Sequence, residues 1–176
     1  MDNLYIDKVE SDVWSGYIVA TDDGLSYVSH VTDNLNDIVT WQMKNYPNSK
    51  LISDSEQIKP YTKQFEEYLT GVRKDFDLPL DVKGTNFQKV VWDALYQIPY
   101  GETASYLDIA KMIGRDQKSS QAVGGAVGSN PISIVCPCHR VVGTDGSLTG
   151  YGGGLDNKIS LLNHEIEHAA TDSTTK

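Results

Sequence analysis

The chain has 176 residues, of which 39% are hydrophobic and 22% charged, and this fits one large or two small globular domains. No apolar run is long enough to span a membrane, and the first residues lack the cationic and apolar character of a signal peptide. The net charge of −9 argues against a general binder of polyanions. We therefore expect a cytoplasmic protein with no membrane partner.

The negative charge is concentrated in the first half of the chain. Residues 1–80 hold seven basic and fourteen acidic side chains, whereas residues 81–165 hold seven and eight. Any contact with a polyanion is therefore expected in the second half. Four basic residues lie there at short separations: Lys111, Arg115, Lys118 and Arg140.

The first 79 residues predict a small α/β domain. Asp22-Asp23-Gly24 is typical of a hairpin turn between two strand-forming runs. The runs rich in strand formers are residues 4–6, 14–20 and 25–29. Helices are predicted over residues 34–45 and 59–69, ended by Pro47 and Gly71.

The second domain, residues 80–168, is predicted to be mainly α-helical. Thr85 and Gln88 have the spacing of a capping box, which opens a helix. A second capping pattern at Ser105 opens another helix, which Gly114 closes. After a four-residue turn, a third helix is predicted over about residues 118–128, and the last two helices form a helix-turn-helix pattern.

The third of these helices contains Gly124, Gly125 and Gly128. Each glycine destabilises a helix interior by about 1 kcal/mol relative to alanine. A helix tolerates this best where another backbone approaches closely. A glycine-rich loop with no binding role is the alternative interpretation.

One further helix is predicted near the end of the chain, beginning near Asp156. Its apolar strip is expected to consist of Leu155, Ile159, Leu162 and Ile166. Glu165 lies at the edge of this strip, where a carboxylate needs a partner, and we expect it to pair with His139. Residues 169–176 are predicted to be a disordered tail.

The stretch Val135-Cys136-Pro137-Cys138-His139-Arg140-Val141 places a thiol, an imidazole and a guanidinium side by side. A thiolate is the most reactive nucleophile among protein side chains, and a neighbouring imidazole makes it available near neutral pH. Because proline fixes its own φ and restricts the backbone conformation of the residue before it, we expect residues 136–138 to be extended and stiff. The two cysteines are too close in sequence for an unstrained disulfide, so we expect free thiols in a reducing compartment.

A zinc site and a thiol hydrolase are two alternative interpretations of this cluster. Structural zinc requires a fourth ligand, usually from a second element, and no other histidine stands in a ligand-pair motif. A hydrolase requires an oxyanion hole and an imidazole positioned from elsewhere in the chain. His139 is adjacent to Cys138, and in an extended segment their side chains point apart, which disfavours a direct bond between them. The third interpretation is a relay in which His139, oriented by Glu165, acts on Cys138 through one water molecule. We expect no metal and no cofactor.

Further motifs accompany this cluster in a fixed order. They are Gly84-Thr85-Asn86-Phe87-Gln88, Val91-Trp92, Ile98-Pro99-Tyr100-Gly101, Ser105-Tyr106, Ala122-Val123-Gly124, Asn130-Pro131, and Gly150-Tyr151-Gly152-Gly153-Gly154 with Lys158, Leu161, Leu162 and Glu165. Together with Pro137–Val141 they resemble the O6-alkylguanine-DNA alkyltransferases, a family of DNA repair proteins. The resemblance implies an α+β protein of two domains. The first is a small ribonuclease-H-like α/β support domain, and the second is a mainly α helix-turn-helix (winged-helix-like) domain that carries the chemistry.

The resemblance also implies roles for individual residues. Cys138 accepts the alkyl group from O6 of guanine, or less well from O4 of thymine, in one irreversible turnover. His139 removes the thiol proton through water, and Glu165 holds the imidazole. Tyr106 donates a proton toward N3 of the base, and Asn130 braces the loop. The base is further contacted by backbone groups of Cys138 and Val141 and by Tyr151 with the amide of Gly152.

For DNA, the resemblance implies that the helix-turn-helix enters the minor groove of the duplex and that the damaged nucleotide rotates out of the stack. The residues expected at this surface are Gln121, Ala122, Gly124, Gly125, Arg140, Arg115 and Lys118. Gln121 stands where the family has an arginine, so we expect weaker duplex affinity and a shallower salt dependence. The protein is expected to be a monomer. An alternative function is a module that binds alkylated bases and recruits other repair factors without chemistry.

Overall fold

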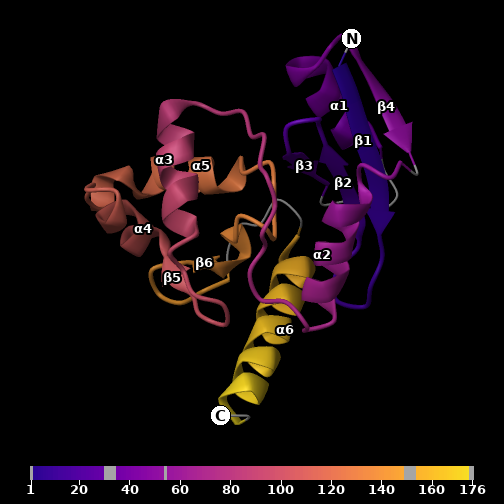
Figure 1. The fold of residues 1–176 in the computed structure, drawn as a ribbon. Helices are drawn as coiled ribbons and strands as arrows, with labels where there is room; N and C mark the ends of the chain where they lie inside the picture. The colour runs from indigo at the N-terminus through magenta and orange to yellow at the C-terminus, as the bar shows by residue number, and fades with distance from the viewer. Residues whose placement is uncertain (1, 30–34, 54, 149–153, 175–176) are drawn as a thin grey trace. The chain divides into compact units, whose positions relative to one another are not determined.

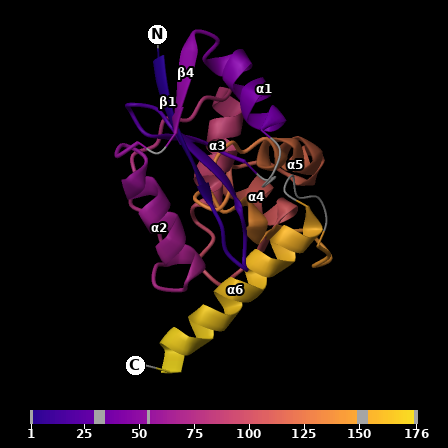
Figure 2. The same ribbon diagram turned by 90° about the vertical axis from the view of Figure 1, so that its right-hand side faces the viewer.

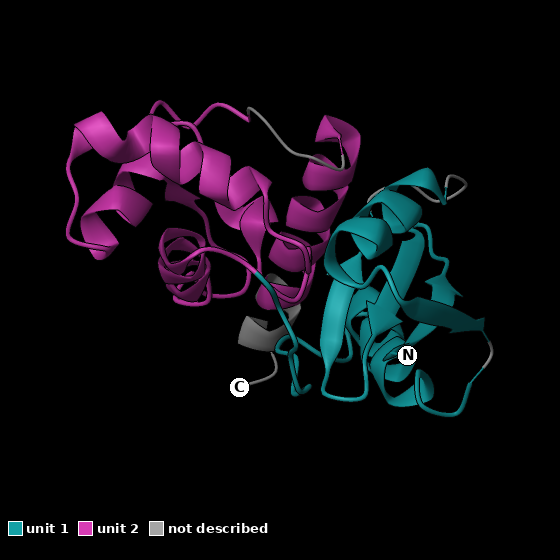
Figure 3. Cartoon of the chain, turned by 90° about the horizontal axis from the view of Figure 1, so that it is seen from above, with its two compact units in different colours: residues 1–83 teal, residues 84–176 magenta. Residues whose placement is uncertain are grey.

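A computed structural model describes residues 2–29, 35–53, 55–148 and 154–174 of the chain (Figure 1). The chain divides into two compact units, residues 1–83 and 84–176, which Figure 3 shows in different colours. Among the described residues, no helix is both long and apolar enough to cross a membrane.

The first unit is built on a four-stranded sheet with the order β3-β2-β1-β4. The strands are β1 (Asp2–Val9), β2 (Gly16–Ala20), β3 (Leu25–Val28) and β4 (Ser49–Ser53). β1 and β3 both pair antiparallel with β2, which confirms the predicted hairpin at Asp22-Asp23-Gly24. β4 pairs parallel with β1, and the sequence analysis missed it because it is a short, mostly polar run.

Two helices complete the first unit, α1 (Asn36–Asn45) and α2 (Lys59–Leu69), close to the predicted ranges. Ile38 of α1 joins a core cluster with Leu4, Ile6 and Val19 of the sheet. On the opposite sheet face, Tyr5 and Ile18 are also buried, as strand alternation requires when both faces are covered. The sheet therefore has a core on each side.

The boundary between the units lies four residues beyond the predicted one. Leu25 donates its N–H to the carbonyl of Pro79 and accepts from the N–H of Asp81, so Leu80 forms an isolated parallel bridge with the first residue of β3. The Thr21 hydroxyl also donates to the Asp81 carboxylate at 2.5 Å. Because these bonds attach the crossing segment to the sheet, the first unit extends to Lys83.

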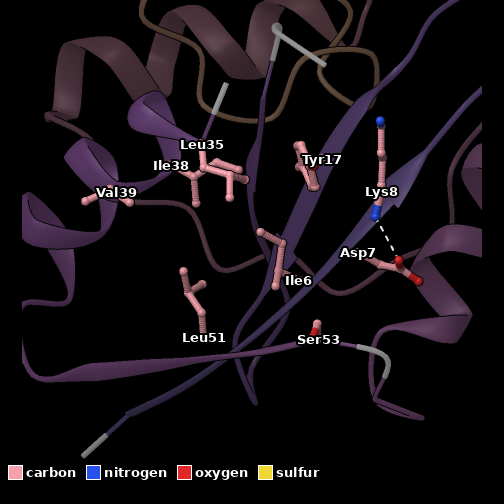
Figure 4. A pocket seen from close by; sticks show the side chains of 9 residues that line it. All are labelled: Ile6, Asp7, Lys8, Tyr17, Leu35, Ile38, Val39, Leu51 and Ser53. Atoms are coloured by element: carbon pink, nitrogen blue, oxygen red, sulfur yellow. Dashed lines mark hydrogen bonds between the residues drawn. The ribbon is translucent and has the colours of Figure 1, made fainter. Parts of the chain in front are cut away.

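A cavity of about 320 Å³ lies in the first unit beside α1 and the sheet (Figure 4). Its lining is mostly aliphatic and aromatic: Ile6, Tyr17, Leu35, Ile38, Val39 and Leu51, with Asp7, Lys8 and Ser53. None of the predicted site residues lines it. The hollow is therefore not the place where the predicted chemistry would occur.

The second unit is built on helices α3 (Asn86–Leu95), α4 (Tyr106–Met112) and α5 (Ser120–Gly128), with the 3-10 turn η1 (Gln117–Ser119) between the last two. Both predicted capping boxes, Thr85 with Gln88 and Ser105 with Asp108, are confirmed. Trp92 is a core residue, and its indole N–H donates to the carbonyl of Ala126 at 2.8 Å, which joins α3 to α5.

The last helix, α6 (Leu155–Thr174), is the longest in the described chain (Figure 2). It continues to Thr174, where the sequence analysis expected a disordered tail from residue 169. The predicted apolar strip was also wrong, because only Leu162 of its four members is buried. The buried face instead holds Lys158, Leu161, Leu162, His164 and Glu165. These residues have helical spacing, but the set begins and ends with a charged residue, so hydrophobicity alone does not reveal it.

Candidate active site

Asn130 fixes the start of the loop that carries the cysteines. Its side-chain amide donates to the carbonyl of Cys136 at 2.8 Å and accepts from the N–H of Ile132 at 3.1 Å. Asn130 is itself buried, so these hydrogen bonds take the place of bonds to water. A shorter side chain would leave them unmade. This geometry is the bracing that the sequence analysis expected.

Residues 136–140 form two consecutive tight turns, which corrects the expectation of an extended segment. Pro137 has φ −81° and ψ 63°, and the N–H of Cys138 donates to the carbonyl of Cys136 at 2.8 Å. The 3-10 helix η2 (Cys138–Arg140) follows at once. Proline does stiffen the segment, but its fixed φ is equally compatible with this compact turn.

A two-residue parallel ladder ties this loop to the start of α4. β5 (Ala104–Ser105) pairs with β6 (Val141–Val142), so Val141 is fully buried and its register is fixed. Tyr106 follows β5 directly as the first residue of α4. Burial raises the pKa of Tyr106, and a negative charge on Cys138 raises it further.

His139 and Glu165 are both fully buried and make the predicted pair, with Nε2 2.7 Å from Oε2. Glu165 as a carboxylate can only accept, so the proton of a neutral His139 lies on Nε2. The basic nitrogen is then Nδ1, which is buried and has no hydrogen-bond partner among the described residues. An imidazole in this state is suited to accept a proton at Nδ1.

Arg140 holds the other side of the same carboxylate. Its Nε donates to Glu165 Oε1 at 2.8 Å, Nη2 donates to Oε2 at 3.0 Å, and Nη1 donates to the carbonyl of Ile98 at 2.7 Å. The expected role of Arg140 as a DNA contact is therefore corrected, because its guanidinium is buried and bonded to the protein interior.

The backbone of Gly101 adds one more donor, at 3.2 Å from Glu165 Oε1. Gly101 has φ +81°, and a Cβ there would lie 2.8 Å from the Cβ of Ala169. Only glycine therefore fits this position without strain. Gly101 is a site residue whose role in holding Glu165 was missed from the sequence.

The electrostatics of the pair follow from burial and from these bonds. Burial alone would raise the pKa of Glu165, but the hydrogen bonds and charges of His139 and Arg140 outweigh it and hold this pKa well below the usual range. Burial lowers the pKa of His139, and this outweighs the opposing effect of Glu165. Near neutral pH the site therefore contains an ionised carboxylate and a neutral imidazole.

Cys138 is 6% exposed and begins η2. Its sulfur lies 3.9 Å from the hydroxyl oxygen of Ser133. Cys136 is also a free, buried thiol, but burial raises its pKa well above the usual value, which makes it a poor nucleophile. Of the two cysteines, Cys138 is the one that shares η2 with His139.

The residues predicted to contact DNA lie on or near α5. Gln121, Ala122, Arg115 and Lys118 are exposed. Gly125 is exposed as well, and a Cβ built there meets nothing within 4 Å, whereas one at Gly124 would touch the ring of Tyr106 at 3.8 Å. Tyr151 and Gly152 lie outside the described residues.

Comparisons with known proteins show which family this chain is similar to. The family model for the ribonuclease-like domain of 6-O-methylguanine DNA methyltransferase matches residues 4–82, and that for its DNA-binding domain matches residues 86–167. The inducible methylated-DNA–protein-cysteine methyltransferase of Bacillus subtilis is 44% identical over 86% of this chain and 84% of its own length. That of Methanosarcina acetivorans is 42% identical over 92% and 98%.

The chain belongs to the O6-methylguanine DNA methyltransferase family. The fold agrees with that of solved members. The crystal structure of Mycobacterium tuberculosis O6-methylguanine methyltransferase matches with a TM-score of 0.81 and 35% identity, covering 99% of both chains. The M. tuberculosis OGT in complex with DNA matches with a TM-score of 0.78 and 34% identity over 94% of both. The expected division into a ribonuclease-like and a DNA-binding domain is thereby confirmed.

We predict that acid destabilises this methyltransferase through His139 and Glu165. Both have a lower pKa in the folded than in the unfolded chain, so the unfolded chain binds more protons in acid. The free energy of unfolding should begin to fall below about pH 6.5, where an unfolded histidine is protonated, and fall more steeply below about pH 4.3, where an unfolded glutamate is. Urea unfolding at a series of pH values measures this.

The variant Glu165→Gln isolates the carboxylate. It should lower the free energy of unfolding at pH 7 by about 3–5 kcal/mol, because Arg140 loses its buried counter-charge. Its stability should also change less with pH than that of the parent. The exposed Glu102→Gln is the matched control. If Glu165→Gln and the parent lose stability in parallel as the pH falls, the carboxylate is not the acid-sensitive group.

Proposed function

We propose that this chain repairs DNA by transferring the alkyl group from O6 of alkylated guanine to the sulfur of Cys138. The observation that carries the proposal is the placement of Cys138 next to a buried, neutral imidazole whose orientation is fixed by Glu165. Membership of the family supports it, as do relatives named methylated-DNA–protein-cysteine methyltransferases. We also propose O4-alkylthymine as a poorer substrate.

The reaction is a displacement at carbon. Nδ1 of His139 accepts the thiol proton through one water molecule, and Glu165 stabilises the imidazolium that forms. The thiolate then attacks the alkyl carbon, forming the sulfur–carbon bond while the carbon–O6 bond breaks. The electron pair of that bond passes to the purine, and Tyr106 donates a proton toward N3, so that guanine leaves as a neutral base.

The remaining predicted roles concern the position of the base and of the loop. Asn130 holds the loop through the carbonyl of Cys136. Backbone groups of Cys138 and Val141 are proposed to accept from the exocyclic amine, and Tyr151 with the amide of Gly152 to support O6. The product is a thioether without a good leaving group, so each molecule reacts once.

The exposed side of α5 is proposed to bind the minor groove of duplex DNA, with the damaged nucleotide flipped out of the base stack. Gly125 and Gly128 support this surface, because a Cβ at either would meet nothing within 4 Å and the described protein gives no packing reason for their presence. A nearby DNA backbone would supply that reason. The protein is proposed to act as a monomer in the cytoplasm.

Mass spectrometry of the intact protein tests the transfer itself. After incubation with duplex DNA containing O6-methylguanine, the protein should gain the mass of one methylene group. Cys138→Ser should still bind the DNA but show no gain, whereas Cys136→Ser should gain mass as the parent does. Binding by the parent without any mass change would support a recognition module in place of an enzyme.

Gly125→Ala separates helix stability from DNA binding. Alanine should raise the free energy of unfolding by up to about 1 kcal/mol, because it favours the helix and meets no neighbour. Duplex affinity, measured by fluorescence anisotropy, should fall several-fold because the methyl group obstructs the DNA backbone. Transfer from the free base O6-benzylguanine serves as the control and should be unchanged. Unchanged duplex affinity would remove α5 from the interface.

The variant Gln121→Arg tests the effect of having glutamine at the position where the family has an arginine. Gln121 is exposed and carries no charge, so arginine should tighten duplex binding by adding one phosphate contact. The slope of log affinity against log salt concentration should then become steeper by about 0.9. An unchanged slope and affinity would show that this position does not meet the duplex.

A further inference from the structure

The sulfur of Cys138 has polar neighbours other than the His139–Glu165 pair. Ser133 is fully buried, and its hydroxyl oxygen lies 3.9 Å from the sulfur, within the range of a sulfur hydrogen bond. A hydroxyl can accept from a thiol and, after rotation, donate to a thiolate. The same contact can therefore serve both protonation states of the nucleophile.

An unusual backbone conformation places Ser133 there. Ile134 has φ 76°, which is a rare left-handed conformation for a β-branched residue. The reversal pairs Ser133 with Cys136 in a short bridge, and the Ile134 side chain is buried where it can be held by packing. Strain of this kind persists when the surroundings fix it, and it is commonly found at functional sites.

The second candidate is Lys158, which is fully buried. It lies seven residues before Glu165 on α6, so both side chains leave the same face of the helix, two turns apart. Burial lowers the pKa of Lys158, and the charge of Cys138 raises it. A buried ammonium stabilises a nearby thiolate, because the attraction between opposite charges is stronger away from water.

The other charged and titratable groups around Cys138 do not supply this cation. Arg140 is bonded on two of its nitrogens to Glu165, which compensates its charge locally. His139 is neutral because burial lowers its pKa. Tyr106 and Cys136 are also neutral, because burial raises the pKa of each.

We propose that Ser133 and Lys158 form a seat for the Cys138 thiolate, in which the hydroxyl orients the sulfur and the ammonium stabilises its negative charge. Both are positioning residues, and neither takes the proton. The inference rests on the proposed function in that Cys138 is the nucleophile. It adds a second support for the thiolate, and the chain keeps this support before DNA binds. For transfer, His139 then needs to shift the equilibrium between the thiol and the thiolate of Cys138 by only a small further amount.

The seat is tested without DNA, by alkylation of the thiol with iodoacetamide over a range of pH. The reagent forms a sulfur–carbon bond and releases iodide, and its rate follows the thiolate fraction. All variants carry Cys136→Ala, and peptide mapping confirms that Cys138 is the labelled residue. Lys158→Met should move the midpoint of the rate–pH curve upward by about one unit and slow labelling at pH 7 about tenfold. Ser133→Ala should shift it in the same direction by a smaller amount, and Lys158→Arg should retain most of the parent rate.

Exposed residues provide the matched controls, Lys89→Met on α3 and Ser147→Ala in the loop after β6, and both should titrate like the parent. Thermal unfolding shows which variants are folded. If Lys158→Met does not fold, Ser133→Ala decides the matter. A rate–pH curve of Ser133→Ala, and of Lys158→Met where it folds, that coincides with the parent curve would overturn the seat. This outcome is independent of the mass gain with alkylated DNA, so the seat can fail while the transfer holds.

Discussion

The carboxylate of Glu165 is the group around which the site is organised. It is fully buried and accepts hydrogen bonds from His139, from two nitrogens of Arg140 and from the backbone of Gly101. A buried carboxylate without such donors would be strongly destabilising. Because the donors come from the segment after α3 and from η2, and the carboxylate itself lies on α6, this group fixes three separate parts of the second unit relative to one another. It fixes the tautomer of His139 by the same contact.

The loop that carries Cys138 is held with similar redundancy. Asn130 bonds its backbone, Pro137 restricts its turn, and β6 pairs it with β5 beside Tyr106. The proposed nucleophile reacts once, so mobility of its loop would bring no advantage, since no product must leave the sulfur. Rigid placement of the thiol, the imidazole and the tyrosine instead reduces the entropy that the reaction must overcome.

Local signals made much of the fold predictable from the sequence. The two capping boxes, the Asp22-Asp23-Gly24 turn and the helix-turn-helix pattern depend on residues close together in the chain, and each is present. The His139–Glu165 pair was predictable because a glutamate on a helix that packs inward needs a partner. β4 was not predictable, since its five residues acquire strand character only by pairing with β1.

The features that were missed depend on tertiary contacts. The buried face of α6 begins with Lys158 and ends with Glu165, so hydrophobicity pointed to the wrong side of the helix. Arg140 was expected at the DNA surface because it is a cation, yet its fork of donors matches the buried carboxylate. The approach of Ser133 to Cys138 follows from the left-handed backbone at Ile134, which no sequence pattern signals.

The identity of the alkylated atom is the most direct test of this account. The protein would be allowed to react to completion with DNA containing O6-methylguanine, digested, and sequenced by tandem mass spectrometry. One S-methylcysteine is expected, at position 138, with Cys136 unmodified. Methylation at Cys136, or a fully unmodified digest from protein that had bound the lesion, would contradict it.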